Sequence, residues 1–348
     1  MLGMNQMIGP IGLDLGTRRV KAVQLCRRKG KWVAQAAACF DRLEPGLTLS
    51  EREAKRIRAV LTRRGFLGTE LSIAVPADGL IEAVLDVPPS GSNAPRDQIV
   101  RIELARQHRI SPDSVEVAYW SLPPNAHAGQ REQVVAVGYP HAQAEVLVRP
   151  LEAVGLTVGG IEPATTALAR MGRPLLRRAD CIGAVLDLGA SGFRLTLVLA
   201  GRVVHHRVLP FAGTGAMAQS LAAHVGDDAA LADAALRHYG VNGSQGYDLG
   251  SILHAEIEPI MVELIEQIGM SFAYVSHQYP AAELGPLLLT GGGARMPGLL
   301  SEMGQALGIA VFTAVPSAVV DAGDWLAEDL DRPEAALATG LAMTGGAA

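Results

Sequence analysis

The stretch IGLDLGTRRV, from Ile11 to Val20, decides the fold of this chain. An apolar strand ends at Asp14 and passes through Gly16 and Thr17 into a second strand, so the segment predicts a tight hairpin. Glycine and small residues allow backbone N–H groups to approach an anion closely. A hairpin alone is usually only a turn, and its meaning depends on what else the chain contains.

The same pattern returns about half a chain later, in AVLDLGASGFRLTLV (Ala184–Val198). Here Asp187, Gly189 and Ser191 take the places of Asp14, Gly16 and Thr17, which indicates an internal duplication. An aspartate repels phosphate but can hold Mg²⁺ through the waters of the ion, and the ion then bridges to phosphate oxygens. Two such hairpins facing each other across a cleft predict a phosphate clamp, with Asp14 and Asp187 holding the metal through water.

A third motif is the triple glycine that follows the apolar strand LLLT. Gly291, Gly292 and Gly293 stand at the start of the next helix, where they leave room for a base and a ribose against the backbone. Each motif is weak by itself. The three in this order and spacing together predict a nucleotide site.

Two hairpins of this kind followed by TGGGA resemble the ATPase superfamily of actin, heat-shock chaperones and sugar kinases. The segments IEPATTALAR (Ile161–Arg170) and AALATGLAM (Ala335–Met343) resemble the two connecting helices of that superfamily. The resemblance implies a two-lobed α/β actin-like ATPase fold, built from duplicated RNase H-like domains. It also implies ATP and Mg²⁺ as cofactors.

Within the superfamily the chain looks most like the PilM family of type IV pilus assembly proteins, over nearly its full length. The opening IGLDLGTRRVKAVQL is similar to the family's IGIDIGSSSVKxVEL, and QIVRIELARQHRI and GRVVHHRVLPFAGT are similar to other family segments. The resemblance implies an ATP-binding adaptor of an inner-membrane pilus assembly platform. Its partners would be the N-terminal cytoplasmic segment of a PilN-type membrane protein and other platform components, and it would meet the membrane only through them.

The chain departs from the family pattern at both hairpins. Arg18 and Arg19 stand among the residues where the family has serines, and they either neutralise phosphate or fill space outside the clamp. In the second hairpin Gly192, Phe193 and Arg194 replace threonines that are common in active ATPases. The loss of these hydroxyls weighs against efficient hydrolysis.

Glu162 precedes Pro163 at the start of a helix, and two roles stay open for it. The carboxylate would interact favourably with the helix dipole, as a cap does. By resemblance to the heat-shock chaperones it would instead position the attacking water, which makes it the candidate catalytic residue.

The order of elements divides the chain into three parts. Lobe one is expected at residues 8–80, 141–178 and 315–345, and an inserted small α+β subdomain at 81–140. Lobe two is expected at 179–314, with a largely helical portion at 214–283. In the inserted subdomain, Tyr119 and Trp120 either belong to its core or line a groove for a partner peptide.

Composition excludes several other classes of protein. The net charge of −5 argues against a nucleic-acid binder, which usually carries a basic patch. The three cysteines, Cys26, Cys39 and Cys181, are far apart and fit reduced thiols better than disulfides. No apolar run approaches the roughly 20 residues of a membrane span. These features lead us to expect a cytoplasmic protein, and the resemblance to the PilM family implies that it is peripheral at the inner membrane.

Two other functions remain open at this point. An active ATPase or small-molecule kinase of the superfamily would need a carboxylate base facing a substrate pocket, and no such base is obvious in the sequence. A filament protein like FtsA would end in an amphipathic membrane-binding helix. This chain ends LAMTGGAA, which is short and uncharged.

Overall fold

The computed structural model describes residues 8–46, 48–124, 132–176, 178–241 and 249–344. Its first sheet has five strands in the order β3-β2-β1-β4-β8. Their bounds are β1 (Ile8–Leu15), β2 (Arg19–Arg28), β3 (Lys31–Asp41), β4 (Glu70–Val75) and β8 (Thr157–Pro163). β1 pairs antiparallel with β2 and parallel with β4, so the hairpin at Asp14 opens at the centre of this sheet.

The second sheet repeats the first in strand order and in strand direction. Its order is β11-β10-β9-β12-β13, and β9 pairs antiparallel with β10 and parallel with β12. The bounds are β9 (Cys181–Leu188), β10 (Phe193–Leu199), β11 (Arg202–Leu209), β12 (Glu283–Thr290) and β13 (Val311–Thr313). The repeat of the same five-stranded pattern confirms the predicted two-lobed actin-like fold of duplicated units.

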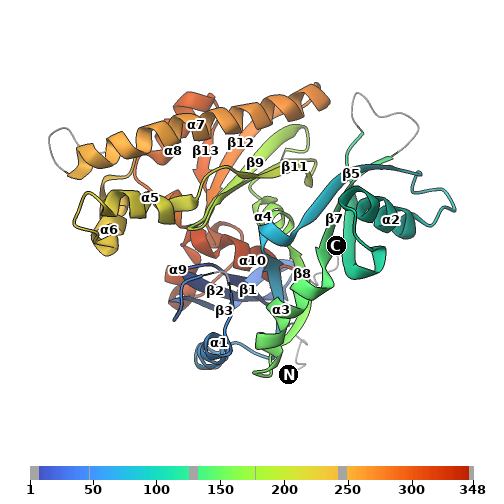
Figure 1. The fold of residues 1–348 in the computed structure, drawn as a ribbon, viewed down its shortest axis with the longest axis horizontal. Helices are drawn as coiled ribbons and strands as arrows, with labels where there is room; N and C mark the ends of the chain where they lie inside the picture. Colours follow the sequence, from blue (N-terminus) through green and yellow to red (C-terminus); the bar gives the residue numbers. More distant parts are fainter. Residues whose placement is uncertain (1–7, 47, 125–131, 177, 242–248, 345–348) are drawn as a thin grey trace.

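Helices cover the two sheets and lie between them (Figure 1). The bounds are α1 (Glu51–Arg63), α3 (His141–Glu152), α4 (Ala164–Gly172), α5 (Gly213–Ala222), α6 (Ala229–Tyr239), α7 (Leu249–Gln278), α8 (Leu299–Leu307), α9 (Asp324–Leu330) and α10 (Ala336–Ala342). The spacing of Ser50 and Glu53 predicts a capping box at the start of α1. Only one of its two reciprocal hydrogen bonds forms. Ser50 accepts a hydrogen bond from the Glu53 backbone N–H at 3.2 Å, while the Glu53 carboxylate accepts from the Leu43 N–H at 2.7 Å.

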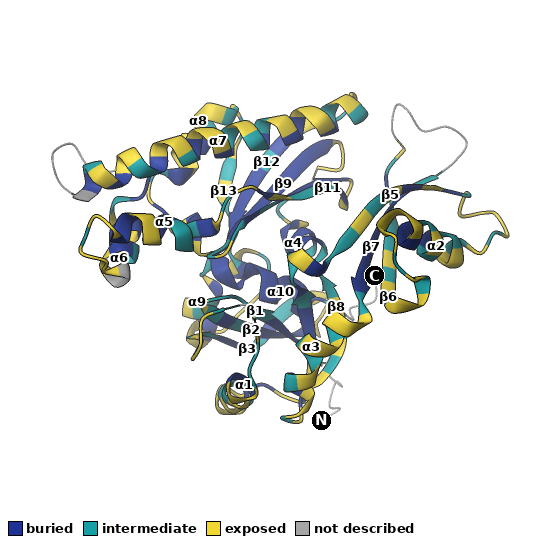
Figure 2. Ribbon diagram, in the orientation of Figure 1, coloured by how far each residue is buried: buried dark blue, intermediate teal, exposed yellow. Residues whose placement is uncertain are grey.

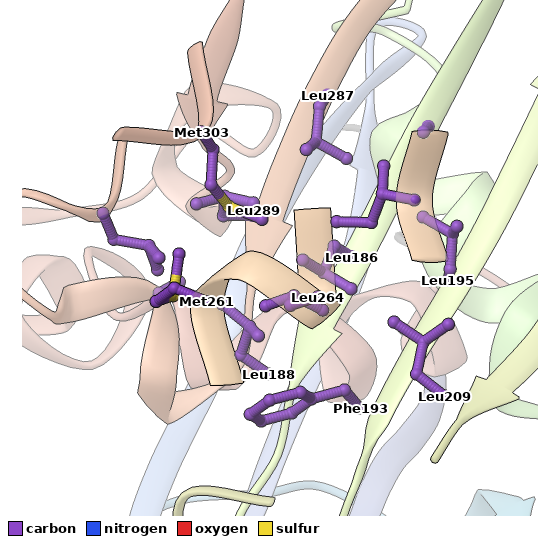
Figure 3. Close-up of a cluster of buried hydrophobic side chains, with 14 of the residues drawn as sticks. Leu186, Leu188, Phe193, Leu195, Leu209, Met261, Leu264, Leu287, Leu289 and Met303 are labelled. Carbon is purple, nitrogen blue, oxygen red and sulfur yellow. The ribbon is translucent and has the colours of Figure 1, made fainter. Parts of the chain in front are cut away.

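The core of lobe two lies between its sheet and α7. Helical spacing predicts one apolar face with Ile257, Ile260, Met261, Leu264, Ile265 and Ile268. Four of these residues are buried, and Ile260 and Ile265 are partly buried against the same core. Figure 3 shows Met261 and Leu264 of α7 beside Leu186, Leu188 and Phe193 of the second hairpin, and beside Leu287 and Leu289 of β12. β9 is buried along its whole length (Figure 2), so the strand that carries Asp187 is held inside the lobe.

The inserted subdomain is a three-stranded antiparallel sheet in the order β5-β7-β6, packed against one helix. The bounds are β5 (Ile81–Val87), β6 (Val115–Ser121), β7 (Glu132–Pro140) and α2 (Arg96–His108). The sequence pattern predicts Ile99, Ile102 and Ala105 on the packed side of α2, and this is wrong for Ile102, which is 46% exposed. Val100 and Leu104 are buried instead, because they share the face that meets β7.

The other face of this small sheet packs on lobe two. Trp120 donates a hydrogen bond from its indole N–H to the Val203 carbonyl at 2.8 Å, and its ring lies 6.4 Å from that of His206. Val135 and Val137 of β7 join the hydrophobic core of lobe two. Tyr119 points the other way and donates to Asp97 at 2.6 Å. Of the two roles left open for this pair, the structure favours packing for both.

Helices α4 and α10 cross between the lobes with their backbones in contact. A Cβ atom placed on Gly340 of α10 would lie 2.0 Å from the Ala167 carbonyl oxygen of α4. Gly12 of β1 is equally close to α10, since a Cβ there would lie 2.0 Å from the Ala338 oxygen. The small residues of the two predicted connecting helices are therefore required for this close crossing.

Three other expectations concern the cysteines, membrane-spanning helices and domain boundaries. All three cysteines are free. Over the ranges that the structure describes, helices are too short or too polar to pass through a lipid bilayer. The residue boundaries predicted for the lobes and for the inserted subdomain stay predictions, because pairing in a sheet does not mark where a domain ends.

The crossing gives a first test. We expect Gly340→Ala to lower the free energy of unfolding by about 1–3 kcal/mol, the usual cost of overpacking, because its methyl group would collide with the α4 backbone. Gly269→Ala on α7 is the matched control, since its Cβ would meet nothing within 4 Å and alanine favours helix. Thermal and urea unfolding measure both. An unchanged midpoint for Gly340→Ala would contradict the close crossing.

Candidate functional site

A cavity of about 350 Å³ lies between the two lobes, at the point where both hairpins end. All predicted site residues except Glu162 line it. They are Asp14, Gly16, Thr17, Arg18, Asp187, Gly189, Ser191, Gly291, Gly292 and Gly293. Segments from opposite halves of the chain therefore meet at one site, although their roles in binding a ligand stay predictions.

In the first hairpin Asp14 lies directly opposite Lys21 in the β1–β2 ladder. The Lys21 ammonium donates to Asp14 Oδ2 at 2.7 Å, and each side chain is only 14% exposed. Burial lowers the pKa of Lys21, but the attraction and hydrogen bond of Asp14, with the more distant charge of Asp187, outweigh it. The pKa of Lys21 is raised as a result, so the ammonium stays charged.

The second hairpin has the same arrangement. Asp187 lies directly opposite Arg194 in the β9–β10 ladder, and the guanidinium donates to Asp187 Oδ2 at 3.1 Å. Burial raises the pKa of Asp187. The guanidinium of Arg194 opposes this rise, and the nearby charge of Asp14 adds to it. The two carboxylates therefore feel each other across the cleft, and each is neutralised by a cation of its own hairpin.

Lys21 is the residue that the sequence reading missed. Lys21 lines the cavity and donates a hydrogen bond to Asp14, although no role is predicted for it from the sequence. A signal was available, because each hairpin has a basic residue seven positions after its aspartate, Lys21 in the first and Arg194 in the second. Residues at directly opposed positions of a hairpin project from the same face of the sheet.

A loop braces the first hairpin from behind. The Arg42 N–H donates to the Arg18 carbonyl and the Gly46 N–H to the Thr17 carbonyl, both at 2.9 Å. The Arg42 guanidinium is buried and donates to the carbonyl of Gly46 and, at 3.5 Å, to that of Gly16. The carbonyl groups of the turn thus accept hydrogen bonds from the loop behind it. The opposite side of the turn faces the cavity.

The second hairpin is braced by the segment that starts α5. The Thr214 N–H donates to the Gly189 carbonyl at 3.1 Å, and the Gly215 N–H to that of Ala190 at 2.9 Å. Gly213 has a φ of +80°, and a Cβ there would lie 2.4 Å from the Gly192 nitrogen. Glycine is required at this position, because any larger residue would be strained and would collide with the Gly192 backbone.

The triple glycine packs against the second hairpin and also faces the cavity. Gly291 has a φ of +79°, and a Cβ there would lie 2.6 Å from Asp187 Oδ1. A Cβ on Gly293 would lie 2.8 Å from the Leu188 side chain. Gly292 is different, because it is exposed and a Cβ on it would meet nothing within 4 Å. Gly292 therefore borders the open space of the cavity.

The two arginines of the first hairpin lie at the edge of the cavity. Arg18 reaches across to Asp233 of α6, at 3.5 Å, and so links the two lobes. Arg19 pairs with Asp41 at 2.8 Å and lies 4.0 Å from Glu334, which precedes α10. Both arginines contribute positive charge to the cavity wall.

Magnesium does not fit the predicted pair of carboxylates well. Asp14 bonds to Lys21, Asp187 bonds to Arg194, and Mg²⁺ needs octahedral space for its several waters. Within the described ranges, no group of three or more acidic, histidine or cysteine side chains could hold a metal ion. A role for Asp14 and Asp187 in metal binding stays a prediction, and their ion pairs oppose it.

Glu162, at the end of β8, lies outside the cavity and is held in place by the helix that follows, α4. The Arg170 guanidinium donates to both carboxylate oxygens, at 2.9 and 2.7 Å, and the Thr166 hydroxyl donates to one of them at 2.7 Å. Arg170 also donates to the Gly340 carbonyl of α10 at 2.6 Å. This geometry favours a structural role for Glu162, although not as the predicted cap, because α4 begins without a side-chain cap hydrogen bond. Through Arg170 it ties α4 to α10 beside their crossing.

Two solved structures share this fold. The PilM-PilN type IV pilus biogenesis complex is 22% identical, covers 98% of this chain and 99% of that one, and has a TM-score of 0.80. The ethanolamine utilization protein EutJ from Carboxydothermus hydrogenoformans is 16% identical, covers 97% and 90%, and has a TM-score of 0.54. At these identities the similarity shows the fold alone.

Sequence comparison identifies the family. No curated protein sequence matches the chain significantly. The family model described as type IV pilus assembly protein PilM matches residues 12–345, which is nearly the whole chain and includes both hairpins and the triple glycine. This chain therefore belongs to the PilM family of type IV pilus assembly proteins.

Proposed function

We propose that this protein is a nucleotide-binding adaptor of a type IV pilus assembly platform. In this function it holds ATP without turning it over and presents a surface to a PilN-type membrane protein. The observation that carries the proposal is the single cavity wall formed by both hairpins and the triple glycine. Membership of the PilM family supports the platform, and the fold shared with the PilM-PilN complex supports the partner.

The cavity suits a nucleoside triphosphate in size and in charge. Its volume of about 350 Å³ lies within the usual range of about 300–1,000 Å³ for ligand pockets. Among the described residues that line it, six side chains are basic and four are acidic, so the wall has a net positive charge. Phosphates would lie against the hairpins, and the adenosine against Gly291–Gly293.

Hydrolysis is not part of the proposal, because each carboxylate among the described residues of the cavity wall has a cation nearby. Each described carboxylate on its wall lies within 4.0 Å of a cation. The pairs are Asp14 with Lys21, Asp187 with Arg194, Asp233 with Arg18 and Arg237, and Glu334 with Arg19 and Arg295. A carboxylate that is paired with a cation would have to give up that ion pair to accept a proton from an attacking water, which makes it a poor general base.

The nucleotide then acts as a conformational ligand. It would touch hairpins that belong to different lobes, so it binds the closed arrangement more tightly and shifts the population toward it. Arg194, Val75 and Ala164 line both this cavity and a neighbouring groove. A change at the hairpins would therefore reach the groove through residues that the two sites share.

The neighbouring groove is the candidate partner site. It has a volume of about 170 Å³ and is lined by lobe one, by lobe two and by the inserted subdomain, for example at Pro163, Val208 and Glu82. Val208 lies on β11, the edge strand of its sheet, and is 56% exposed. An extended peptide can pair with an edge strand and place side chains in such a groove. We assign it to the N-terminal segment of the PilN-type protein, which would place this chain at the cytoplasmic side of the inner membrane.

A bulky residue at Gly292 tests the nucleotide site. Gly292→Leu should fold normally, because nothing lies within 4 Å of its Cβ, but its side chain would enter the cavity. We expect calorimetry to show an ATP affinity lowered about tenfold or more, roughly 1.4 kcal/mol, with an unchanged unfolding midpoint. Gly269→Leu on α7 is the control with equal free space. Equal affinity in the parent and in Gly292→Leu would exclude ATP from this cavity.

The role of Glu162 is tested by a double-mutant cycle with Arg170. We expect Glu162→Ala and Arg170→Ala each to lower the thermal unfolding midpoint, with a coupling energy of about 0.5–3 kcal/mol in the double variant. Phosphate release from ATP should stay at background in all four proteins. Measurable release by the parent that Glu162→Ala abolishes would instead assign Glu162 a catalytic role.

The groove is tested with a labelled peptide that carries the N-terminal cytoplasmic segment of a PilN-type protein. Val208→Asn should weaken binding in a fluorescence polarisation assay, because it replaces an exposed apolar side chain of the groove with a polar one. Val262→Asn on α7 is the control, since Val262 is 53% exposed and lies outside the groove. If both variants bind the peptide as the parent does, the peptide uses another surface.

A further inference from the structure

We propose that nucleotide binding by this protein needs no divalent metal ion, because Lys21 and Arg194 supply the positive charge that a metal would bring to the phosphates. This inference rests on the proposed nucleotide site and specifies how that site meets its ligand. It departs from the sequence-based expectation of Mg²⁺ between Asp14 and Asp187.

The strand register places both cations. Asp14 and Lys21 are directly opposed in the β1–β2 ladder, and Asp187 and Arg194 are directly opposed in the β9–β10 ladder. Opposed residues of an antiparallel pair have Cβ atoms about 4.5–5.5 Å apart on one face, so each ion pair follows from the backbone. The duplicated hairpin therefore carries a duplicated aspartate–cation pair, one from each side of the cleft.

Asp187 lines the cavity but leaves little room for a hydrated ion. Its Oδ2 accepts from Arg194 at 3.1 Å, and its Oδ1 lies so close to the backbone of Gly291 that a Cβ there would be 2.6 Å away. The residue is 8% exposed. A magnesium ion keeps most of its waters and requires near-octahedral space, which this carboxylate does not leave.

The first hairpin is built to bring the lysine to the same place. Lys21 Nζ lies 2.7 Å from Asp14 Oδ2, and a Cβ on Gly16 would lie 2.6 Å from that nitrogen. Gly16 thus leaves space for the ammonium beside the turn that faces the cavity. Lys21 and Arg194 both line the cavity, so both can reach a bound phosphate from their present positions.

The described residues of the cavity wall include more basic than acidic side chains. Arg18, Arg19, Arg237 and Arg295 lie on the same wall as Lys21 and Arg194, against the four carboxylates named above. A dication placed between Asp14 and Asp187 would be repelled by the two cations that already hold them. A triphosphate is attracted by the same groups, and guanidinium in particular binds phosphate oxygens in pairs.

The test is calorimetric titration of the full chain with ATP, once in excess MgCl₂ and once in EDTA. We expect the two dissociation constants to agree within about threefold, which is less than 1 kcal/mol. Arg194→Thr removes the cation and frees Asp187. It should bind ATP about tenfold or more weakly in EDTA than the parent and should recover part of the loss in MgCl₂.

Two further variants keep the test decisive. Arg194→Lys retains a cation and should retain affinity in EDTA, and Lys21→Gln probes the first hairpin if Arg194→Thr does not fold. Arg202→Thr is the matched control, because Arg202 lies on the neighbouring strand and outside the cavity. It should bind ATP as the parent does in both buffers.

The outcomes separate this inference from the proposed function. ATP binding that requires MgCl₂ in the parent would overturn metal independence and leave the nucleotide site intact. The same affinity in parent and Arg194→Thr in EDTA would also overturn it. Absence of ATP binding in both buffers would overturn the nucleotide site itself, and the inference with it.

Discussion

The structure depends on one steric constraint, the contact of two helix backbones between the lobes. At the crossing of α4 and α10 only a hydrogen fits on Gly340, because a Cβ would lie 2.0 Å from the Ala167 oxygen. Gly12 brings β1 equally close to α10. The Arg170 bridge from Glu162 to the Gly340 carbonyl fixes the same place with polar bonds. Because β1 and α4 both meet α10 here, this contact determines how near the two hairpins can come.

Electrostatics then determine what the cleft can hold. Two unpaired carboxylates that face each other in a cleft would cost free energy. Each of them instead lies opposite a cation on the next strand of its own hairpin. The result is a site with more positive than negative side chains on its described wall and with every described carboxylate near a cation. Such a site is suited to keep a nucleotide bound. For hydrolysis, one of these described carboxylates would first have to leave its cation in order to act as a base.

The inserted subdomain connects this site to the surface. It contributes Val135 and Val137 to the core of lobe two, and Trp120 bonds to the β11 backbone, so it is packed firmly on that lobe. The groove beside it shares Arg194 with the cleft. A nucleotide that engages Arg194 therefore acts on a residue that also borders the proposed partner site, which is the physical basis for a nucleotide-dependent adaptor.

The sequence by itself determined the duplicated fold, the two hairpins and ten of the residues that line the cleft. These features follow from local patterns, since an apolar strand, Asp-Leu-Gly and a small residue specify a hairpin wherever the chain carries them. The apolar face of α7 followed from helical periodicity in the same way. Only the tertiary structure decided the partners of the charged groups: Lys21 for Asp14, Arg194 for Asp187, and Arg170 for Glu162. It also decided that Trp120 packs on a strand more than eighty positions away. A charge or a ring chooses its partner by distance in the folded chain, and a one-dimensional pattern does not contain that distance.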